Sequence, residues 1–453
     1  MGGASSSSKR GGGGRTGKPG VPGQLAAPVG LPPQPPYHGH PVLYHHVVIN
    51  ATIDINARLS FMAPDVSIAC TNVEQYYPQL AAMYEQGYRM LVFVSHPGST
   101  RSYGLGQAQS VVKFQGIFRR LFSEEEGRQW ELRVEKSSFL NQTFLNWSGS
   151  MLLTARRTTG SATDSSQIFQ TLERITEAGG RLVSVELTGM AGQQLEMQRQ
   201  LMSRQANRQL WNTGTMPVMQ VAVDVFYEVP RSGGGGERYM YQVVPCPMTS
   251  QMTMSGMQHR WVSTIPWETV MSQYLGSGWK LVEIFEDYST SMNYNNQQMF
   301  STNISMQKNC LWIFEKPASR RDDPTPLYES TMVEHWCTVS MEVHAMGFGG
   351  ASTNVATNWE PMLDHYGRSG WQVVRIMDTP DTRIQGMFNP TIHQRQLIFF
   401  QRLKEGFTEN GCGATSGFPR GAPPSYGEVG AAPPLPFNAP AVPGSNELYS
   451  EKH

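Results

Sequence analysis

The amino-acid sequence predicts an α+β fold: four β-α-β-β repeats forming antiparallel sheets with helices packed on one face, and disordered N- and C-terminal arms. A helix–glycine–strand segment recurs along the chain, strand-like runs flank each copy, and both chain ends are rich in glycine and proline. An amphipathic helix between strands buries its apolar face against the sheet that those strands form. These three observations together favour a helix-on-sheet architecture.

The clearest repeat is a pair of segments that align without a gap, WETVMSQYLGSGWKLVEI at 267–284 and WEPMLDHYGRSGWQVVRI at 359–376. Eight of the eighteen aligned residues are identical. Each segment predicts an amphipathic helix that stops at a glycine, Gly278 or Gly370, before a buried strand. Because the chain must turn sharply there, both glycines are expected to have positive φ, and the tryptophan after each is expected to pack between helix and sheet.

Two less similar copies precede this pair. YYPQLAAMYEQGYRMLVF at 76–93 has Gly87 at the helix end, and IFQTLERITEAGGRLVSV at 168–185, the weakest copy, has Gly179. Alternating or apolar runs on both sides of each copy predict one strand before the helix and two after it. The strands before the helices are expected in HHVVINATIDI, QWELRVEK, RYMYQVVP and HWCTVSMEV, and the last strands in SVVKFQGIF, VMQVAVDVFYEV, CLWIFEK and QLIFFQRL.

A glycine run, RSGGGGE at 231–237, divides the folded part into two pairs of repeats. The two chain ends contain too few apolar residues to offset the conformational entropy lost on ordering, so both are expected to be disordered. The predicted organisation is a disordered basic arm at 1–40, repeats at 41–122, 123–232, 237–322 and 323–405, and a disordered Pro/Gly-rich tail at 406–453.

The composition argues against several functional classes. Charged residues make up 16% of the chain and the formal net charge is zero, so no overall field favours nucleic acid. The five cysteines are scattered and never form C-x-x-C, which argues against a disulfide framework or a zinc finger. Cys310 and Cys337 are expected to be buried as small hydrophobic residues. No apolar run approaches the ~18 residues of a membrane-spanning helix, and no secretory signal is expected.

The first twenty residues, MGGASSSSKRGGGGRTGKPG, admit two interpretations. The run G-x-x-x-x-G-K-P is close to a phosphate-binding loop, but Pro19 stands where the loop needs a Ser or Thr hydroxyl, and no buried strand precedes it. The start M-G-x-x-x-S fits N-myristoylation, since Gly2 would accept the acyl group after removal of Met1, and Ser6 is the preferred hydroxyl. The acylation motif is the favoured interpretation.

Four basic residues follow this motif: Lys9, Arg10, Arg15 and Lys18. One myristoyl chain alone binds a membrane with an association constant on the order of 10⁴ M⁻¹, which is marginal and reversible. A basic residue near an anionic leaflet adds up to about 1 kcal/mol of binding free energy. The four residues are therefore expected to strengthen binding to anionic inner-leaflet lipids.

The C-terminal tail carries a candidate partner-binding motif, Pro423-Pro424-Ser425-Tyr426, which matches the P-P-x-Y ligands of WW domains. A polyproline conformation lowers the entropy lost when such a segment docks. The overlapping run YGEV starts at Tyr426 and matches the Y-x-x-Φ pattern that endocytic adaptors bind. A tail that tethers without binding any partner remains the third interpretation.

No linear catalytic motif occurs, neither G-x-S-x-G nor H-E-x-x-H. His38, His40, His45 and His46 cluster and could ligate a metal, but two lie in a Pro-rich arm and two begin a strand, so solvent-facing histidines are the favoured interpretation. The sequence therefore predicts that the protein is not an enzyme and that it uses no cofactor or metal. A site assembled from several repeats would leave no linear motif, and that alternative stays open.

Stretches of the first and fourth repeats resemble the raftlin family. They are NVEQYYPQLAAMYEQGYRM in the first repeat, and MVEHWCTVSMEV, SGWQVVRIMDTP and HQRQLIFFQRL in the fourth. The resemblance extends over 41–405 but is strong only in these two repeats, and its motifs mark a fold rather than a catalytic site. In one respect the chain departs from the family. Raftlins begin Met-Gly-Cys, with a myristoyl and a palmitoyl site, whereas this chain has Gly3 and no cysteine before Cys70.

The resemblance implies a lipid-anchored protein at the cytoplasmic face of the plasma membrane, associated with membrane rafts, receptor signalling and ligand uptake. The predicted function is thus a non-enzymatic, N-myristoylated peripheral membrane scaffold of raftlin type. Its expected partners are anionic inner-leaflet lipids, receptors, and WW-domain or endocytic adaptor proteins, with no nucleic acid among them. The alternative is a soluble adaptor that acts through its C-terminal P-P-x-Y ligand.

Overall fold

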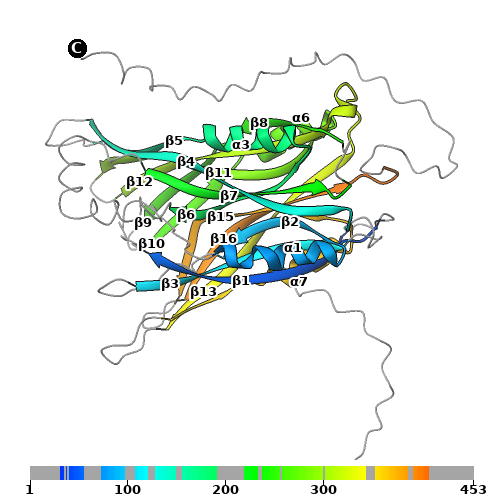
Figure 1. The fold of residues 1–453 in the computed structure, drawn as a ribbon. Helices are drawn as coiled ribbons and strands as arrows, with labels where there is room; N and C mark the ends of the chain where they lie inside the picture. Colours follow the sequence, from blue (N-terminus) through cyan, green and yellow to red (C-terminus); the bar gives the residue numbers. More distant parts are fainter. Residues whose placement is uncertain are drawn as a thin grey trace, which may run out of the picture.

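The structure is a computed structural model and is mainly antiparallel β-sheet, with the helices α1, α3, α6 and α7 between strands (Figure 1). It describes residues 31–34, 37, 40–55, 73–96, 108–120, 128–148, 156–190, 219–232, 237–255, 258–298, 301–342, 352–385 and 391–407.

Each of the four α-helices in the described residues belongs to one consecutive segment of the chain. The first segment contains β1 (Leu43–Ile55), η1 (Val73–Tyr76), α1 (Tyr77–Glu85), β2 (Tyr88–Ser95) and β3 (Ala108–Arg120). The second contains β4 (Trp130–Ser148), β5 (Arg156–Asp164), α3 (Ser166–Glu177), β6 (Arg181–Met190) and β7 (Met219–Pro230). The third contains β8 (Tyr239–Pro245), β9 (Met248–Ser255), β10 (Gln258–Thr264), α6 (Trp267–Gly276), β11 (Lys280–Gln298), β12 (Ser301–Pro317) and η2 (Ala318–Arg320). The fourth contains β13 (Tyr328–Glu342), β14 (Ser352–Ala356), α7 (Trp359–Gly367), β15 (Gln372–Gln385) and β16 (Thr391–Leu403).

The strands of every segment pair in the same order. The last strand lies between the first strand and the strand that follows the helix, as in β1-β3-β2 and β13-β16-β15. β7 takes this middle place between β4 and β6, and β12 takes it between β8 and β11. Pairing of β5 with β11 joins the second and third segments into one nine-stranded sheet. All these pairings are antiparallel, as predicted.

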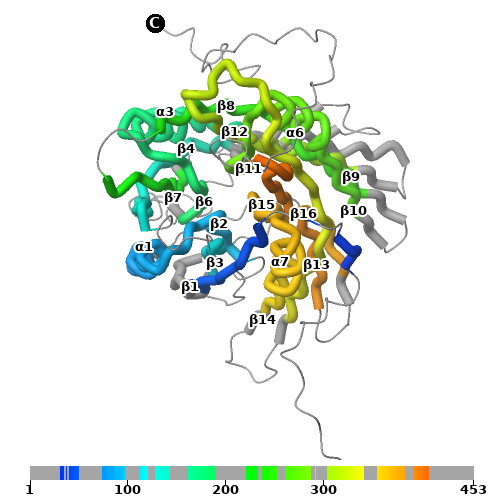
Figure 2. Tube along the Cα trace, turned by 90° about the vertical axis from the view of Figure 1, so that its right-hand side faces the viewer, coloured from blue at the N-terminus to red at the C-terminus, as the bar shows by residue number. Residues whose placement is uncertain are grey.

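The four strands that follow the helices meet at the centre of a propeller-like ring. We call β2, β6, β11 and β15 the inner strands. β2 contacts β6, β6 contacts β11, β11 contacts β15, and β15 contacts β2 again. Figure 2 views this ring along its axis, with the inner strands around the centre and the helices farther out. The ring is therefore closed by the contact between the first and fourth segments.

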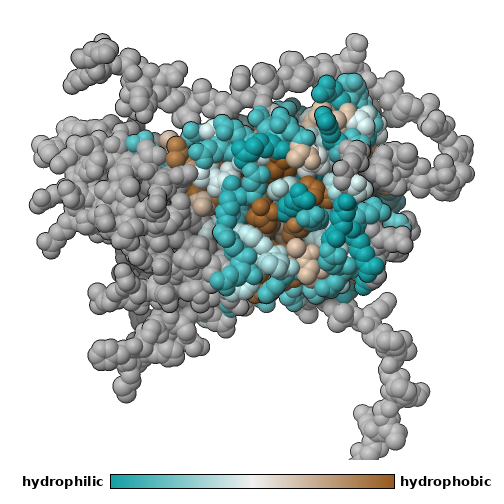
Figure 3. Space-filling view, in the orientation of Figure 1, coloured by the Kyte–Doolittle hydropathy of each residue, from teal (hydrophilic) through white to brown (hydrophobic). Residues whose placement is uncertain are grey.

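Each helix packs between two neighbouring segments and contributes to the apolar core there. Leu80 of α1 packs with residues of its own sheet and with Phe226 of β7, in the second segment. Leu363 of α7 packs with Val92 and Ile117 of the first segment, which closes the ring. The prediction placed each helix on one face of its own sheet. It did not predict that the helix also packs against the sheet of a neighbouring segment. Figure 3 shows hydrophilic residues over most of the visible described surface, with hydrophobic residues in the hollow between them.

The glycine after each helix has the conformation that the repeat predicts. φ is 87° at Gly87, 77° at Gly179, 80° at Gly278 and 77° at Gly370. At Gly278 the next amide, that of Trp279, donates a hydrogen bond of 3.0 Å to the Tyr274 carbonyl and so closes the last helical turn. The prediction of positive φ at Gly278 and Gly370 is confirmed.

Substituting these glycines separates backbone strain from steric clash. A Cβ at Gly278 would lie 2.9 Å from the Thr325 carbonyl oxygen, whereas a Cβ at Gly179 would meet nothing within 4 Å. Gly179→Ala is therefore expected to lower the free energy of unfolding by about 1–2 kcal/mol through positive φ alone. Gly278→Ala is expected to lower the free energy of unfolding further, because the backbone around Thr325 must also move to make room for the new methyl group. Urea denaturation measures both losses, and equal losses would contradict the clash at Gly278.

The prediction of a single strand before each helix is wrong in three segments. β5, β9, β10 and β14 form additional hairpins there. Their sequences, such as RRTTGSATD and MTSQMTMS, are rich in Thr and Ser and lack the apolar alternation of a half-buried strand. Threonine favours extended backbone, and these strands are paired through their backbones with neighbouring strands.

The folded part also begins earlier than the predicted boundary at residue 40. The Trp371 indole Nε1 donates to the Gln34 side chain at 3.2 Å, and the Tyr37 hydroxyl donates to the Leu403 carbonyl at 3.3 Å. The Arg402 guanidinium carbon lies 4.5 Å from the centre of the Tyr37 ring. Residues 31–34 and Tyr37, which we call the docked strap, therefore lie against the fourth segment. The proline-rich composition of this part of the chain is typical of a disordered arm, so the sequence did not predict this contact.

Candidate functional site

The inner strands share a β-bulge at the fourth residue after each repeated glycine. The pairing register shifts at Leu91, Val183, Val282 and Val374, one in each strand. A bulge inserts one unpaired residue and re-aims the side chains on either side of it. Polar residues before all four bulges, and after three of them, consequently gather on the ring axis in two groups.

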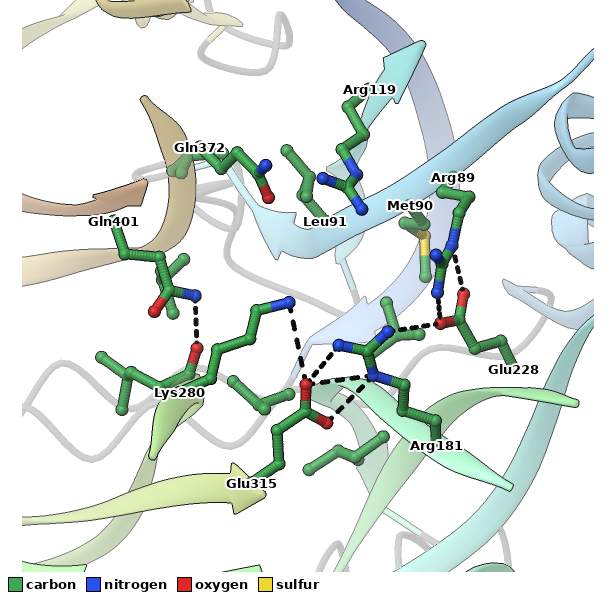
Figure 4. A pocket seen from close by; sticks show the side chains of 16 residues that line it. Arg89, Met90, Leu91, Arg119, Arg181, Glu228, Lys280, Glu315, Gln372 and Gln401 are labelled. Atoms are coloured by element: carbon green, nitrogen blue, oxygen red, sulfur yellow. Dashed lines mark hydrogen bonds and ion pairs between the residues drawn. The ribbon is translucent and has the colours of Figure 1, made fainter. Parts of the chain in front are cut away.

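The outer group consists of eight side chains, two from each segment. The second residue after each glycine pairs with a residue of the middle strand. The pairs are Arg89 with Arg119, Arg181 with Glu228, Lys280 with Glu315, and Gln372 with Gln401. We call these eight residues the axial cluster. They line a cavity of about 50 Å³ together with apolar residues of the inner strands (Figure 4).

Ion pairs connect the axial cluster across three segments. Glu228 forms an ion pair with Arg89 of the first segment and lies 3.7 Å from Arg181 Nη1. Arg181 Nε donates to both Glu315 oxygens, at 3.0 and 3.1 Å, and so reaches the third segment. Glu315 also lies 3.7 Å from Lys280 Nζ. Each carboxylate thus contacts two cations.

The fourth segment joins this network through an amide. Gln401 Nε2 donates a hydrogen bond of 2.6 Å to the Leu281 carbonyl of the third segment. Both Glu228 and Glu315 are 2% exposed, so the network is desolvated. Buried ion pairs are retained only where geometry and further hydrogen bonds compensate for lost hydration. The axial cluster therefore holds the segments at fixed relative positions.

A second polar group lies just beyond the bulges. Arg375 of β15 places its Nη1 3.3 Å from Glu283 of β11 and its Nη2 3.1 Å from Glu186 of β6. The second Glu283 oxygen accepts hydrogen bonds from the Ser184 hydroxyl at 2.9 Å and the Val185 amide at 2.7 Å. We call Ser184, Glu186, Glu283 and Arg375 the deep cluster. It connects three inner strands, and the Ser95 hydroxyl of β2 donates to Glu186 at 3.2 Å.

The environment of the deep cluster disfavours a second negative charge. Burial raises the pKa of Glu186 to about 7, the Arg375 guanidinium opposes that rise, and the Glu283 carboxylate adds to it. Near neutral pH, Glu186 is therefore poised between its two protonation states. Because of this raised pKa, the charge in the ring interior changes with pH near neutrality.

A larger cavity of about 150 Å³ borders the axial cluster; it is lined mainly by the third segment, with Arg181 of the second and Tyr328 of the fourth. Arg181, Lys280 and Glu315 line both cavities. Arg320 and Tyr239 are among the residues that line only the larger one. The two cavities therefore share the charged side chains that connect the second and third segments.

The sequence-predicted site residues do not form this site. Gly2, Lys9, Arg10, Arg15, Lys18, Pro423, Pro424 and Tyr426 lie outside the described residues. His46 Nδ1 lies 2.7 Å from the Gln115 amide, and within the described ranges no three His, Cys, Asp or Glu side chains come together as a metal site. Cys310 and Cys337 are buried free thiols, as predicted.

The axial cluster was not predicted, although the sequence carries a signal for it. Arg, Arg, Lys and Gln occupy the second position after the four glycines, at the start of strands that are otherwise apolar. Polar residues at a strand end are common and solvent-facing, so this signal becomes specific only when the strands are known to converge.

No family model matches the chain, and no curated protein or solved structure matches it either. In the part of the chain that the structure describes, none of the helices has the length and apolar character needed to cross a membrane. The candidate site is therefore characterised by its own residues and their geometry.

Proposed function

We propose that the protein is a non-enzymatic, N-myristoylated peripheral membrane scaffold of raftlin type, acting in receptor signalling or ligand uptake at the cytoplasmic face of the plasma membrane. The acylation motif at Gly2 and the raftlin-like stretches of the first and fourth segments support this proposal. The structural observation that carries it is the docked strap, which attaches the N-terminal arm to one place on the ring.

We further propose that the four segments are copies of one β-α-β-β unit. Three corresponding features support this: a positive-φ glycine after the helix, a bulge four residues later, and a last strand in the middle of the sheet. The additional hairpins would then be insertions into this unit. Four units closed in a ring would present their outer surfaces in fixed relative positions, which suits a scaffold.

The charged groups of the ring interior support a structural role. In both clusters, the carboxylates contact cations or hydrogen-bond donors from neighbouring segments. Such pairing leaves these groups engaged in holding the ring together, which suits a rigid platform. Partners would then bind the outer surfaces, the hairpins or the two arms.

The docked strap also brings both ends of the folded part together. Tyr37 contacts Leu403, the last residue of β16, so the chain enters and leaves the ring at the fourth segment. Gly2 precedes Leu31 by 29 residues, which span at most ~100 Å when fully extended. Pro423 follows Leu403 by 20 residues. A partner bound to the P-P-x-Y motif would therefore be tethered to the same part of the ring as the acylated N-terminus.

Flotation with lipid vesicles tests the proposed anchor. Protein produced with N-myristoylation is expected to float with vesicles containing anionic lipid, and Gly2→Ala is expected to remain in the soluble fraction. Gly3→Ala is the matched control, because it changes the neighbouring glycine and keeps the acceptor; it should float like the unaltered protein. A Gly2→Ala protein that floats equally well at high salt would place the anchor elsewhere. If neither protein floats, the soluble adaptor is the better account.

A further inference from the structure

The docked strap contacts the fourth segment with every third residue. Leu31, Gln34 and Tyr37 are half-buried, whereas Pro32 and Pro33 are exposed. A polyproline II helix has three residues per turn, so residues that are three apart lie on the same side of it. The half-buried residues therefore have the spacing of a polyproline II ligand that presents one side to the ring.

The ring meets this side of the strap with hydrogen-bond donors. His365 Nε2, in α7, donates to the Pro32 carbonyl at 3.0 Å, and Trp371 Nε1 donates to the Gln34 side chain at 3.2 Å. Proline has no N–H, and a polyproline segment makes no internal hydrogen bonds, so its carbonyl groups are available to a partner. Donors beside an apolar surface, on which Leu31 packs, are the features by which proline-rich segments are recognised.

The Tyr37 ring occupies a place that is shaped for a flat group. A Cβ at Gly370 would lie 2.2 Å from a carbon of this ring, so the ring lies directly on the glycine backbone. The Arg402 guanidinium carbon stands 4.5 Å from the centre of the Tyr37 ring and 4.3 Å from the centre of the Trp371 ring. Arginine stacks well on aromatic faces, so this arrangement selects an aromatic side chain.

Contacts that do not involve the strap hold this surface in place. Arg402 Nη1 donates to the Ser369 carbonyl at 2.8 Å, and the Tyr44 hydroxyl donates to the Trp371 carbonyl at 2.8 Å. In contrast, none of the described strap residues is fully buried. Segments held by a few partly exposed contacts open at a lower free energy than the core does. The strap can therefore leave while the surface beneath it keeps its shape.

We infer that this surface of the fourth segment is a recognition site for proline-rich protein segments, occupied by the strap until a partner's segment displaces it. The partner's segment would share the pattern of the strap, with an apolar residue followed by proline, a glutamine three residues after the apolar one, and a tyrosine three residues later. The inference assigns a partner-binding site to the ring itself. It does not rest on the proposed lipid anchor, because the site lies in the fourth segment.

Fluorescence anisotropy with a labelled peptide, LPPQPPYHGHP, tests this site in the full chain produced without acylation. The unaltered chain is expected to bind the peptide weakly, because its own strap competes at a high effective concentration. Tyr37→Ala weakens the strap and should bind the peptide at least fivefold more tightly. Leu43→Ala is the matched control, since Leu43 begins β1 outside the strap and is 62% exposed; its affinity should equal that of the unaltered chain.

Two further changes test the specificity of the site. A peptide with alanine in place of its tyrosine should bind the Tyr37→Ala chain at least tenfold more weakly. In that chain, His365→Ala removes the donor to the proline carbonyl and should weaken binding of the original peptide at least threefold. Asp364→Ala changes an exposed neighbour on α7 and should leave the affinity unchanged.

A strap that serves only to stabilise the ring makes the opposite prediction. Tyr37→Ala would then lower the unfolding midpoint without creating any affinity for the peptide. No binding by a folded Tyr37→Ala chain, or equal affinity for the two peptides, would overturn the inference. If Tyr37→Ala does not fold, Tyr37→Phe replaces it, since it keeps the ring on Gly370 and loses only the hydrogen bond to the Leu403 carbonyl. Tyr37→Phe should bind the peptide at least twofold more tightly than the unaltered chain does, and equal affinity would contradict displacement of the strap.

Discussion

Replacing Arg375 with alanine is expected to lower the free energy of unfolding by about 3–5 kcal/mol at pH 8, because it leaves buried carboxylates without their cation. Arg375 lies 3.3 Å from Glu283 and 3.1 Å from Glu186, and Glu283 is fully buried. The loss should appear as a lower urea midpoint for the whole ring, since the deep cluster connects the inner strands. Urea denaturation followed by tryptophan fluorescence measures it.

Arg383→Ala is the matched control for this variant. Arg383 lies farther along the same strand, is exposed, and stacks over Trp336 with its guanidinium carbon 4.2 Å from the ring centre. An exposed cation–π contact stabilises by only about 0.5–1 kcal/mol. Similar small losses in both variants would contradict the role of the deep cluster in holding the ring together.

Glu186→Gln is expected to flatten the dependence of stability on pH. Burial raises the pKa of Glu186 to about 7 from an ordinary value of 4.5, so the folded protein binds its proton more tightly than the unfolded chain does. The contribution of Glu186 to the free energy of unfolding is fully present below pH 4.5 and is lost as the pH rises through about 7. At roughly 1.4 kcal/mol per pKa unit, the loss reaches about 3 kcal/mol.

The measurement compares the free energy of unfolding at pH 5 and pH 8 in both proteins. The unaltered protein should lose more stability over this interval than Glu186→Gln does. Asp224 and Asp378 also have raised pKa values through burial, but both proteins contain them, so the difference isolates Glu186. Parallel pH profiles would contradict the assignment.

Local features of the fold were predictable because they depend on neighbouring residues. The sequence around Gly278 specifies a helix, a left-handed residue and a strand within a few positions, and the structure has all three. Burial of Cys310 followed from its apolar strand. Such features need no knowledge of which segments meet.

Features that depend on distant contacts were not predictable in this way. Nothing in the sequence of α7 indicates that Leu363 packs against Val92 and so closes the ring. The polar hairpins lack the alternation that identifies a half-buried strand, and Tyr37 lies in a proline-rich run that is typical of an unfolded arm. Arg181 and Glu315 form one site only because a bulge and a shared axis bring them together.

The mass of the intact protein, expressed together with an N-myristoyltransferase, tests the proposed lipid anchor most directly. The proposal predicts that Met1 is removed and that the remaining chain gains the mass of one myristoyl group, whereas Gly2→Ala loses Met1 and gains nothing. An unmodified mass for the unaltered chain, under conditions where a known substrate is fully acylated, would contradict the proposed lipid-anchored scaffold.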